Sequence, residues 1–314
     1  MENILNMHKM KIIDEQKIII NLLNKDNIGN DSKIYSKEVF NKALNEFILN
    51  SKPNQHTVLG FDIYKYSHYE KEKQRLLPLI FFFLYNFVLS DIQKSNILFK
   101  DRDIKYWNDL FISTGDGGFQ IFPSPIHAIP MLIEFHYALR LFNEGNLLPE
   151  LNKYIGNIEI RYCLTHGEVY RINHKHYHNH YGEAIINCSR IISLDKLNRF
   201  LIDENVYKWF LMHFGGIESL ELITWNFIFK KKEVVNLVNL DLKEEFLDTN
   251  FLNFKDNEFG KYNRIKSTDI QKIGQIKIKD SDFSIYSVYL KAIYNDDSEI
   301  RIISVGNQNS NGLI

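Results

Sequence analysis

The chain has 314 residues, which is enough for one large domain with extensions or for two domains. Charged residues make up 25% of it and the net charge is -1, so no overall field favours binding to nucleic acid or to a membrane surface. Residues 1–30 show no small-residue cleavage site, and acids interrupt their apolar residues, so a secretory signal is not expected. Cys163 and Cys188 lie in apolar segments without a CxxC spacing, which indicates buried, reduced thiols in a cytoplasmic protein.

The first part of the chain is predicted to be mainly helical. Apolar residues recur at roughly helical spacing through residues 1–55. A second helical stretch is expected over 69–89, with Ser67 as its cap. Its most apolar part, 76–89, is too short for the ~20 residues that span a bilayer. Because that part also contains Pro78, we interpret it as a buried helix with a kink or a second start.

Alternating and turn patterns predict a sheet in the middle of the chain. An apolar run over 56–62 indicates a strand, and the Asp-Gly turn within 110–122 is a strong signal for a tight β-hairpin. The order of elements predicts an α+β fold with a ferredoxin-like βαββαβ sheet that has helices on one face. The elements after the hairpin are a helix over 126–142, a strand over 158–171, a helix over 182–192 and a closing hairpin over 225–239.

The last part of the chain differs in character. A polar stretch leads into three alternating runs, at 275–279, 283–292 and 299–305, which predict a small β-rich segment. The expected organisation is an N-terminal helical extension at 1–55, a central domain at 56–243 and a C-terminal β-rich appendage at 244–314.

Two aspartates, Asp62 and Asp116, stand where predicted strands end. The first closes the strand that begins at His56, and the second lies in the Asp-Gly turn of the hairpin. A carboxylate at a hairpin tip beside another at a strand end presents hard oxygen ligands to one point, which suits two Mg²⁺ or Mn²⁺ ions and a triphosphate. The competing interpretation is a pair of solvent-facing turn acids, because Asp-Gly is simply good turn chemistry.

Four segments resemble, in this order, the class III nucleotidyl cyclases, the family of adenylate and guanylate cyclase catalytic domains. The resemblance covers roughly residues 56–243, with an interval of 54 positions between the aspartates (116 minus 62). It implies a class III cyclase catalytic domain in a head-to-tail homodimer, with active sites at the subunit interface. The four segments are 61–67, 115–117, 161–167 and 182–190.

The resemblance also implies roles for single residues. Asp62 and Asp116, with the backbone carbonyl of Ile63, would hold two Mn²⁺ or Mg²⁺ ions per active site. Arg190 of the other subunit would stabilise charge on the phosphates in the transition state. The expected contacts to the nucleoside triphosphate are Lys65, Tyr66 and Ser67 after the first aspartate, and Lys230 or Lys232 in the closing hairpin.

Several of these roles keep an alternative. Arg190 is either the catalytic arginine or a surface or salt-bridge arginine on a helix, and the run with Lys230 and Lys232 is by default a solvated turn. Lys65 stands where relatives usually have glycine, so it either touches a phosphate or is a solvated loop lysine. Tyr66 either walls the nucleotide pocket or is a half-buried tyrosine at a strand end.

The departures from the family pattern concern the base. Purine cyclases carry a lysine or glutamate four residues before the second aspartate, where this chain has Ile112, and an aspartate or cysteine where it has Asn179. The asparagine expected four residues before Arg190 is also displaced: Ile186 stands there and Asn187 follows. Without the purine readers, the chain resembles the pyrimidine cyclases of the bacterial Pycsar anti-phage system.

That subfamily implies conversion of UTP or CTP to cyclic UMP or cyclic CMP, as a signal to a separate effector protein in antiviral defence. Two alternatives stay open, a degenerate cyclase domain that binds nucleotide without turnover and an adenylate or guanylate cyclase. A diguanylate cyclase needs a GG(D/E)EF-type hairpin, which 115–119 is not. His174, His176, His178 and His180 alternate and would share one face of a strand, which indicates either a transition-metal site or, as we favour, an exposed hairpin arm.

Overall fold

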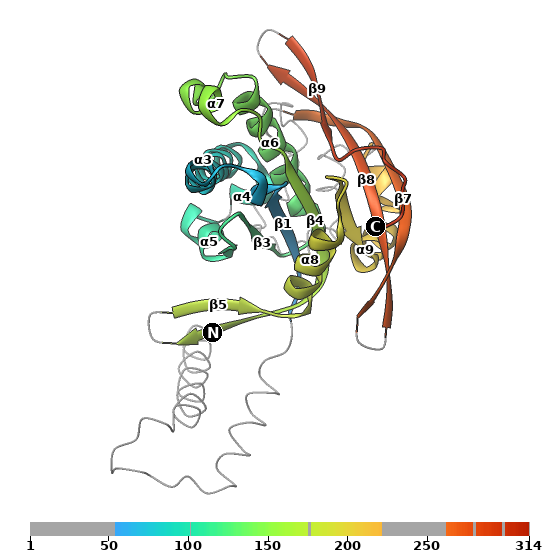
Figure 1. Ribbon diagram of the computed structural model, residues 1–314. Helices are drawn as coiled ribbons and strands as arrows, with labels where there is room; N and C mark the ends of the chain where they lie inside the picture. The colour runs from blue at the N-terminus through green and yellow to red at the C-terminus, as the bar shows by residue number, and fades with distance from the viewer. Residues whose placement is uncertain are drawn as a thin grey trace, which may run out of the picture. The chain divides into compact units, whose positions relative to one another are not determined.

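The computed structural model describes residues 54–100, 102–174, 177–221, 262–278, 281–296 and 299–313 (Figure 1). The predicted helices before residue 54 and the closing hairpin at 225–239 lie outside the described residues. Contacts divide the chain into two compact units. The smaller unit includes, of the described residues, Asn54, 169–174 and 177–181, and the other described residues belong to the larger unit.

Strands and helices alternate along the chain as the sequence predicts, with several short helices in addition. The strands are β1 (Asn54–Ile63), β2 (Phe111–Ser113), β3 (Gly117–Phe122), β4 (Ile160–His174), β5 (Tyr177–Tyr181), β6 (Phe200–Asp203), β7 (Tyr262–Ile278), β8 (Ser281–Asp296) and β9 (Glu299–Val305). The helices are η2 (Tyr66–His68), α3 (Lys71–Ser95), α4 (Ile97–Lys100), α5 (Ile104–Asp109), α6 (Pro125–Asn143), α7 (Pro149–Ile155), α8 (Glu183–Leu194), α9 (Glu204–Phe214) and η3 (Ile217–Glu221).

The sheet follows the order β2-β3-β1-β4-β6-β8-β7. Its first four strands are the ferredoxin-like set, with β3 antiparallel to both β1 and β2, which confirms the predicted βαββαβ order in an α+β fold. β6 then runs parallel to β4, and β8 pairs antiparallel with β6. The three predicted C-terminal runs correspond to β7, β8 and β9, and they continue the central sheet (Figure 1).

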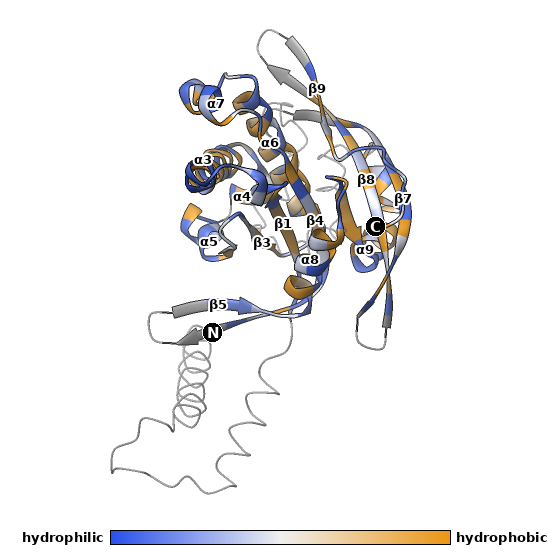
Figure 2. Ribbon diagram, viewed as in Figure 1, coloured by the Kyte–Doolittle hydropathy of each residue, from blue (hydrophilic) through white to orange (hydrophobic). Residues whose placement is uncertain are grey.

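Helices cover both faces of the sheet, so the expectation of helices on one face was wrong. Phe61 on β1 points towards α3 and α6, with its ring centroid 5.8 Å from that of Phe81 and 4.8 Å from that of Phe135. Its neighbour Gly60 points to the opposite face, where a β-carbon would come within 2.6 Å of the Cys188 sulfur on α8. Figure 2 shows hydrophobic residues concentrated on α6 and the central strands between these layers.

The two cysteines fit the sequence-based expectation. Cys163 and Cys188 are both free and fully buried. Burial raises the pKa of the Cys163 thiol well above its usual range, which disfavours the reactive thiolate. Both side chains therefore serve packing between β4 and α8.

Helix α3 runs without interruption through Pro78, and Ser67 does not cap it. Ser67 lies in the short helix η2, and α3 begins after Glu70. Proline at position 78 cannot donate to the carbonyl of Gln74, and the Tyr66 hydroxyl donates to that carbonyl instead, at 2.8 Å. The substituted bond explains why the helix does not restart.

Among the described residues, α3 is the one helix long and apolar enough to cross a membrane, by length and composition only. Core helices pass the same test, and one side of α3 is packed in the core through Leu77, Phe81 and Leu84. That packing agrees with the predicted buried helix.

Candidate active site

The β2–β3 hairpin brings Asp116 against the end of β1. The amide of Ile63 donates to the carbonyl of Asp116 at 2.9 Å, and Asp62 pairs in register with Gly117. A β-carbon on Gly117 would lie 2.1 Å from the carbonyl oxygen of Phe61, so only glycine allows this approach. The predicted hairpin is confirmed, and the two aspartates stand on adjacent strand ends.

Asp62 is already paired with a cation. Arg161, at the start of β4, donates from Nε to Oδ2 of Asp62 at 2.8 Å and also from Nη2 to the same oxygen. Burial raises the pKa of Asp62, the Arg161 guanidinium lowers it, and the negative charge of Asp116 raises it, with a net upward shift. A partly buried carboxylate beside a second carboxylate is stabilised by positive charge, whether guanidinium or metal ion.

The segment that begins with Arg161 is one of the four that resemble the cyclases, but no role was predicted for this arginine from the sequence. Its partner Asp62 lies 99 positions earlier, and its second acceptor is the backbone carbonyl of Asp195, reached through Nη1. The one available signal was a basic residue at the start of an otherwise apolar strand.

The donor set fits a hard divalent cation only in part. Within the described residues there is no group of three or more His, Cys, Asp or Glu side chains that could hold a metal ion. Asp62 and Asp116 supply two carboxylates, and the Thr114 hydroxyl donates to Oδ1 of Asp116 at 3.5 Å. Any cation here would need further oxygen ligands from backbone carbonyls, such as that of Ile63, and from substrate phosphates.

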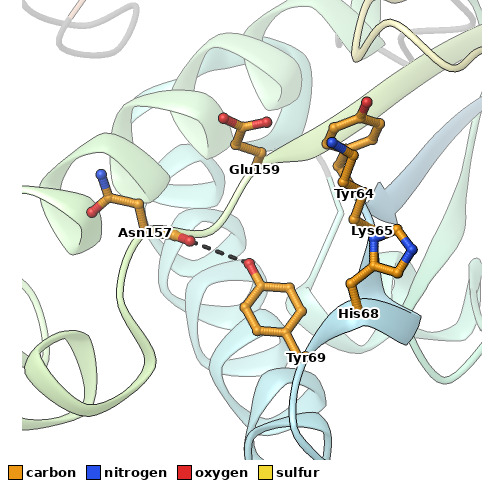
Figure 3. Close-up of a pocket in the computed structure, with 6 residues that line it drawn as sticks. All are labelled: Tyr64, Lys65, His68, Tyr69, Asn157 and Glu159. Atoms are coloured by element: carbon orange, nitrogen blue, oxygen red, sulfur yellow. Dashed lines mark hydrogen bonds between the residues drawn. The ribbon is translucent and has the colours of Figure 1, made fainter.

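An open pocket of about 370 Å³ is formed in part by the residues that follow Asp62 in the sequence (Figure 3). The Tyr64 ring stands beside two cations, with Nζ of Lys65 4.9 Å and Cζ of Arg161 5.6 Å from its centroid. Lys65 adopts the left-handed conformation with φ of 56°, which glycine adopts with less strain than other residues. The pocket is lined by Tyr64, Lys65, His68, Tyr69, Asn157 and Glu159.

Three other predicted substrate contacts, which do not line this pocket, differ in burial. Tyr66 is half-buried and its hydroxyl is bonded to Gln74, as described above. Ser67 is exposed, and its carbonyl accepts a bond from the Gln74 amide at 3.3 Å. Ile112 is half-buried on β2, in register with Phe119 of β3.

Helix α8 carries Arg190 on an exposed surface. Ile186, one turn earlier and on the same face, is 50% exposed. Asn187 is 3% exposed, and its amide donates to Glu183 at 3.4 Å. The displaced asparagine therefore faces inward, and an aliphatic side chain accompanies the arginine.

Three predicted site residues remain, one in the smaller unit and two outside the described residues. Asn179 belongs to β5 in the smaller unit, where its Oδ1 accepts from the His180 amide at 2.9 Å and its Nδ2 donates to Tyr181 at 3.2 Å. Lys230 and Lys232 lie outside the described residues, as do the side chains of His174, His176 and His178.

No protein-family model and no curated protein matches the chain. Solved structures with a similar fold include the guanylate cyclase domain of RhGC from Catenaria anguillulae in complex with GTP, at 13% identity over 75% of this chain and 96% of that chain, with a TM-score of 0.41. The adenylyl cyclase CyaB from P. aeruginosa matches at 14% identity over 74% and 93%, with a TM-score of 0.38. Because the identities and TM-scores are this low, these matches do not show the activity, which has to be inferred from the residues of the site.

Proposed function

We propose that the protein is a metal-dependent nucleotidyl cyclase that acts on a pyrimidine nucleoside triphosphate. The observation that carries the proposal is the pair of adjacent carboxylates, Asp62 and Asp116, one at the end of β1 and one in the hairpin that pairs with it. Their mutual repulsion and the partial burial of Asp62 favour a bound cation. The motif resemblance supports the same chemistry.

In this proposal Asp62, Asp116 and the carbonyl of Ile63 hold two Mn²⁺ or Mg²⁺ ions. When bound, such ions activate the ribose 3′ hydroxyl as Lewis acids and neutralise the leaving pyrophosphate. Arg161 would stay bonded to Oδ2 of Asp62 and so orient this carboxylate for the ions. Lys65 adds a second cation beside the pocket, close to the Tyr64 ring.

Arg190 is proposed to act on the active site of a second copy in a homodimer. The side chain is exposed, and the neighbouring Ile186 exposes an aliphatic surface that a partner subunit would cover. Arg190 would stabilise the charge that develops on the phosphates during cyclisation. A dimer of this kind has two active sites, each built from both subunits.

Pyrimidine preference rests on Ile112 and Asn179. An aliphatic side chain at 112 offers no hydrogen bond to a purine, while the amide of Asn179 can both donate and accept. UTP and CTP are both compatible with this pair. The cyclic product, cyclic UMP or cyclic CMP, would serve in the cytoplasm as a messenger to a separate effector in anti-phage defence.

Incubation of the purified protein with ATP, GTP, CTP and UTP in turn, each with Mn²⁺, tests the proposal when products are resolved by mass. Cyclic UMP or cyclic CMP is the expected product, and the Asp62→Asn variant should give none. Cyclic AMP or cyclic GMP would keep the cyclase mechanism and overturn the role given to Ile112 and Asn179.

A second candidate is a nucleotide-binding sensor without turnover. The inward-facing Asn187 favours it, because the exposed face of α8 then carries no amide beside Arg190. Tight binding of a nucleoside triphosphate by a folded dimer, with no product from any of the four substrates, would establish the sensor and exclude the cyclase.

A further inference from the structure

The segment between α8 and β6, residues 195–199, contacts the candidate metal site through its backbone. We refer to it as the 195–199 loop. The carbonyl of Asp195 accepts a hydrogen bond from Nη1 of Arg161. The next carbonyl, of Lys196, accepts one from the Tyr64 hydroxyl at 2.7 Å. The loop therefore holds both the guanidinium that pairs with Asp62 and the ring that stands beside that guanidinium.

The opposite side of the 195–199 loop is held by residues 307–311, which we call the C-terminal segment. The Asn307 amide donates to two consecutive carbonyls in the middle of the loop, both at 2.7 Å. Nη1 of Arg199 donates to the carbonyl of Asn311 at 2.5 Å and to that of Asn309 at 3.3 Å. These bonds join chain positions about 110 residues apart.

A buried ion pair joins the two ends of the 195–199 loop. The Asp195 carboxylate accepts from the backbone amide of Arg199 at 2.8 Å and from its Nε at 2.9 Å. The two side chains are 1% and 0% exposed, so water cannot replace these partners. Movement of the C-terminal segment would remove acceptors from Arg199 and so loosen Asp195.

We propose that the C-terminal segment, acting through the 195–199 loop, positions Arg161 against Asp62 and thereby orients the candidate metal site. Both bonds from Arg161 to Asp62 fall on Oδ2. A third bond, from Nη1 to the Asp195 carbonyl, fixes the rotation of the Arg161 guanidinium plane. Oδ1 of Asp62 is then the carboxylate oxygen that turns to a cation. The catalytic consequence rests on the proposed function, whereas the positioning itself does not.

The proposal is tested first without nucleotide or metal, by hydrogen exchange of arginine Nε–H groups in ¹⁵N-arginine-labelled full-length protein. An Arg161→Lys variant assigns the Arg161 signal by its disappearance. Asn307→Ala should speed exchange at Arg161 by about 10-fold, as loss of one or two hydrogen bonds in the network predicts. Asn307→Gln keeps the amide and should restore part of the protection.

Two internal controls separate positioning from general loosening. The Gln308 amide bonds Asp269 on β7 at 3.4 Å instead of the loop, so Gln308→Ala should leave Arg161 exchange unchanged. Nε of Arg140, which donates to Glu144 at 2.7 Å elsewhere on the surface, should exchange equally in all variants. Unchanged exchange at Arg161 in Asn307→Ala, or an equal rise at Arg140, overturns the proposal.

Turnover gives a second readout. Asn307→Ala should lower kcat by about 3- to 10-fold with a smaller change in KM, because a loosened Arg161 would orient the Asp62 carboxylate less well for transition-state stabilisation. A change confined to KM would contradict positioning for catalysis. A wild-type protein without turnover would refute the cyclase function, and the exchange experiment would still decide the positioning.

Discussion

Two aspartate–arginine pairs in this protein differ in burial, and the difference predicts which of the two pairs can bind a ligand. The side chains of Asp62 and Arg161 are 19% and 17% exposed, whereas those of Asp195 and Arg199 are 1% and 0% exposed. The buried pair is surrounded by additional hydrogen-bond partners, so neither charge can leave without a large penalty. The partly exposed pair can take up a ligand on Oδ1 of Asp62, since water and ions reach it and both Arg161 bonds fall on Oδ2.

The largest effect on turnover is expected when the partly exposed pair loses its carboxylate. Asp62→Asn keeps the shape of the side chain but removes the charge that would bind a cation, so turnover should fall by about 10³-fold or more. The free energy of unfolding should change by only about 1 kcal/mol, because the pair is partly exposed. Product formation and urea unfolding measure the two quantities. Retained turnover would remove Asp62 from the mechanism.

The buried pair should respond in the opposite way. Arg199→Met leaves the Asp195 carboxylate buried without its cation and should lower the free energy of unfolding by about 3–5 kcal/mol. As a matched control, Arg140→Met breaks an exposed pair with Glu144 and a bond to the Ile302 carbonyl, and it should cost about 1 kcal/mol. Chemical denaturation of both variants makes the comparison. Equal losses would show that burial does not distinguish these arginines.

Arg190 belongs to neither aspartate–arginine pair and tests whether an exposed arginine contributes to turnover without contributing to stability. Arg190→Ala should lower kcat by about 10²-fold with little change in KM or in stability, because the side chain is exposed on α8. Mixing Arg190→Ala with Asp62→Asn protein should restore activity at one of the two shared sites of a mixed dimer. Steady-state kinetics on the mixture measures this. A raised KM with unchanged kcat would contradict a transition-state role.

The smallest effect is expected at Lys65. Lys65→Gly should stabilise the fold by about 0.5–1 kcal/mol, because glycine tolerates a φ of 56° better than lysine. If the ammonium touches a phosphate, the same change raises KM for the triphosphate, and Lys65→Arg does not. Thermal unfolding and KM are measured on both variants. Unchanged KM in Lys65→Gly would identify a solvated loop lysine.

Local signals in the sequence predicted much of the fold. The alternation of β1, the Asp-Gly hairpin, α6 and the glycine before α8 depend on neighbouring residues, and all are present. Ser67 was wrongly predicted as a helix cap, because η2 intervenes and the Tyr66 hydroxyl replaces the bond that Pro78 removes. β6 was not predicted, since a strand of four residues carries little periodic signal. The 11-residue helix α9 that follows it was also not predicted.

The candidate site was predicted only in part for the same reason. Asp62 and Asp116 follow directly from turn chemistry at strand ends. Arg161 and the 195–199 loop act through contacts between residues 34 to 112 positions apart, which no local pattern reveals. The buried position of Asn187 follows from helix geometry, since a shift of one residue turns a side chain by about 100°.

The place of β6 in the sheet has a consequence for synthesis on the ribosome. This strand pairs with β4 on one side, and among the described residues its other edge pairs with residues 285–288 of β8. Until those residues leave the ribosome, one edge of β6 has no partner strand, although the strand is buried in the folded protein. Such an edge is prone to pair with other chains. A chain that ends before residue 281 should therefore aggregate rather than fold, and chaperone binding during translation should last until β8 has been made.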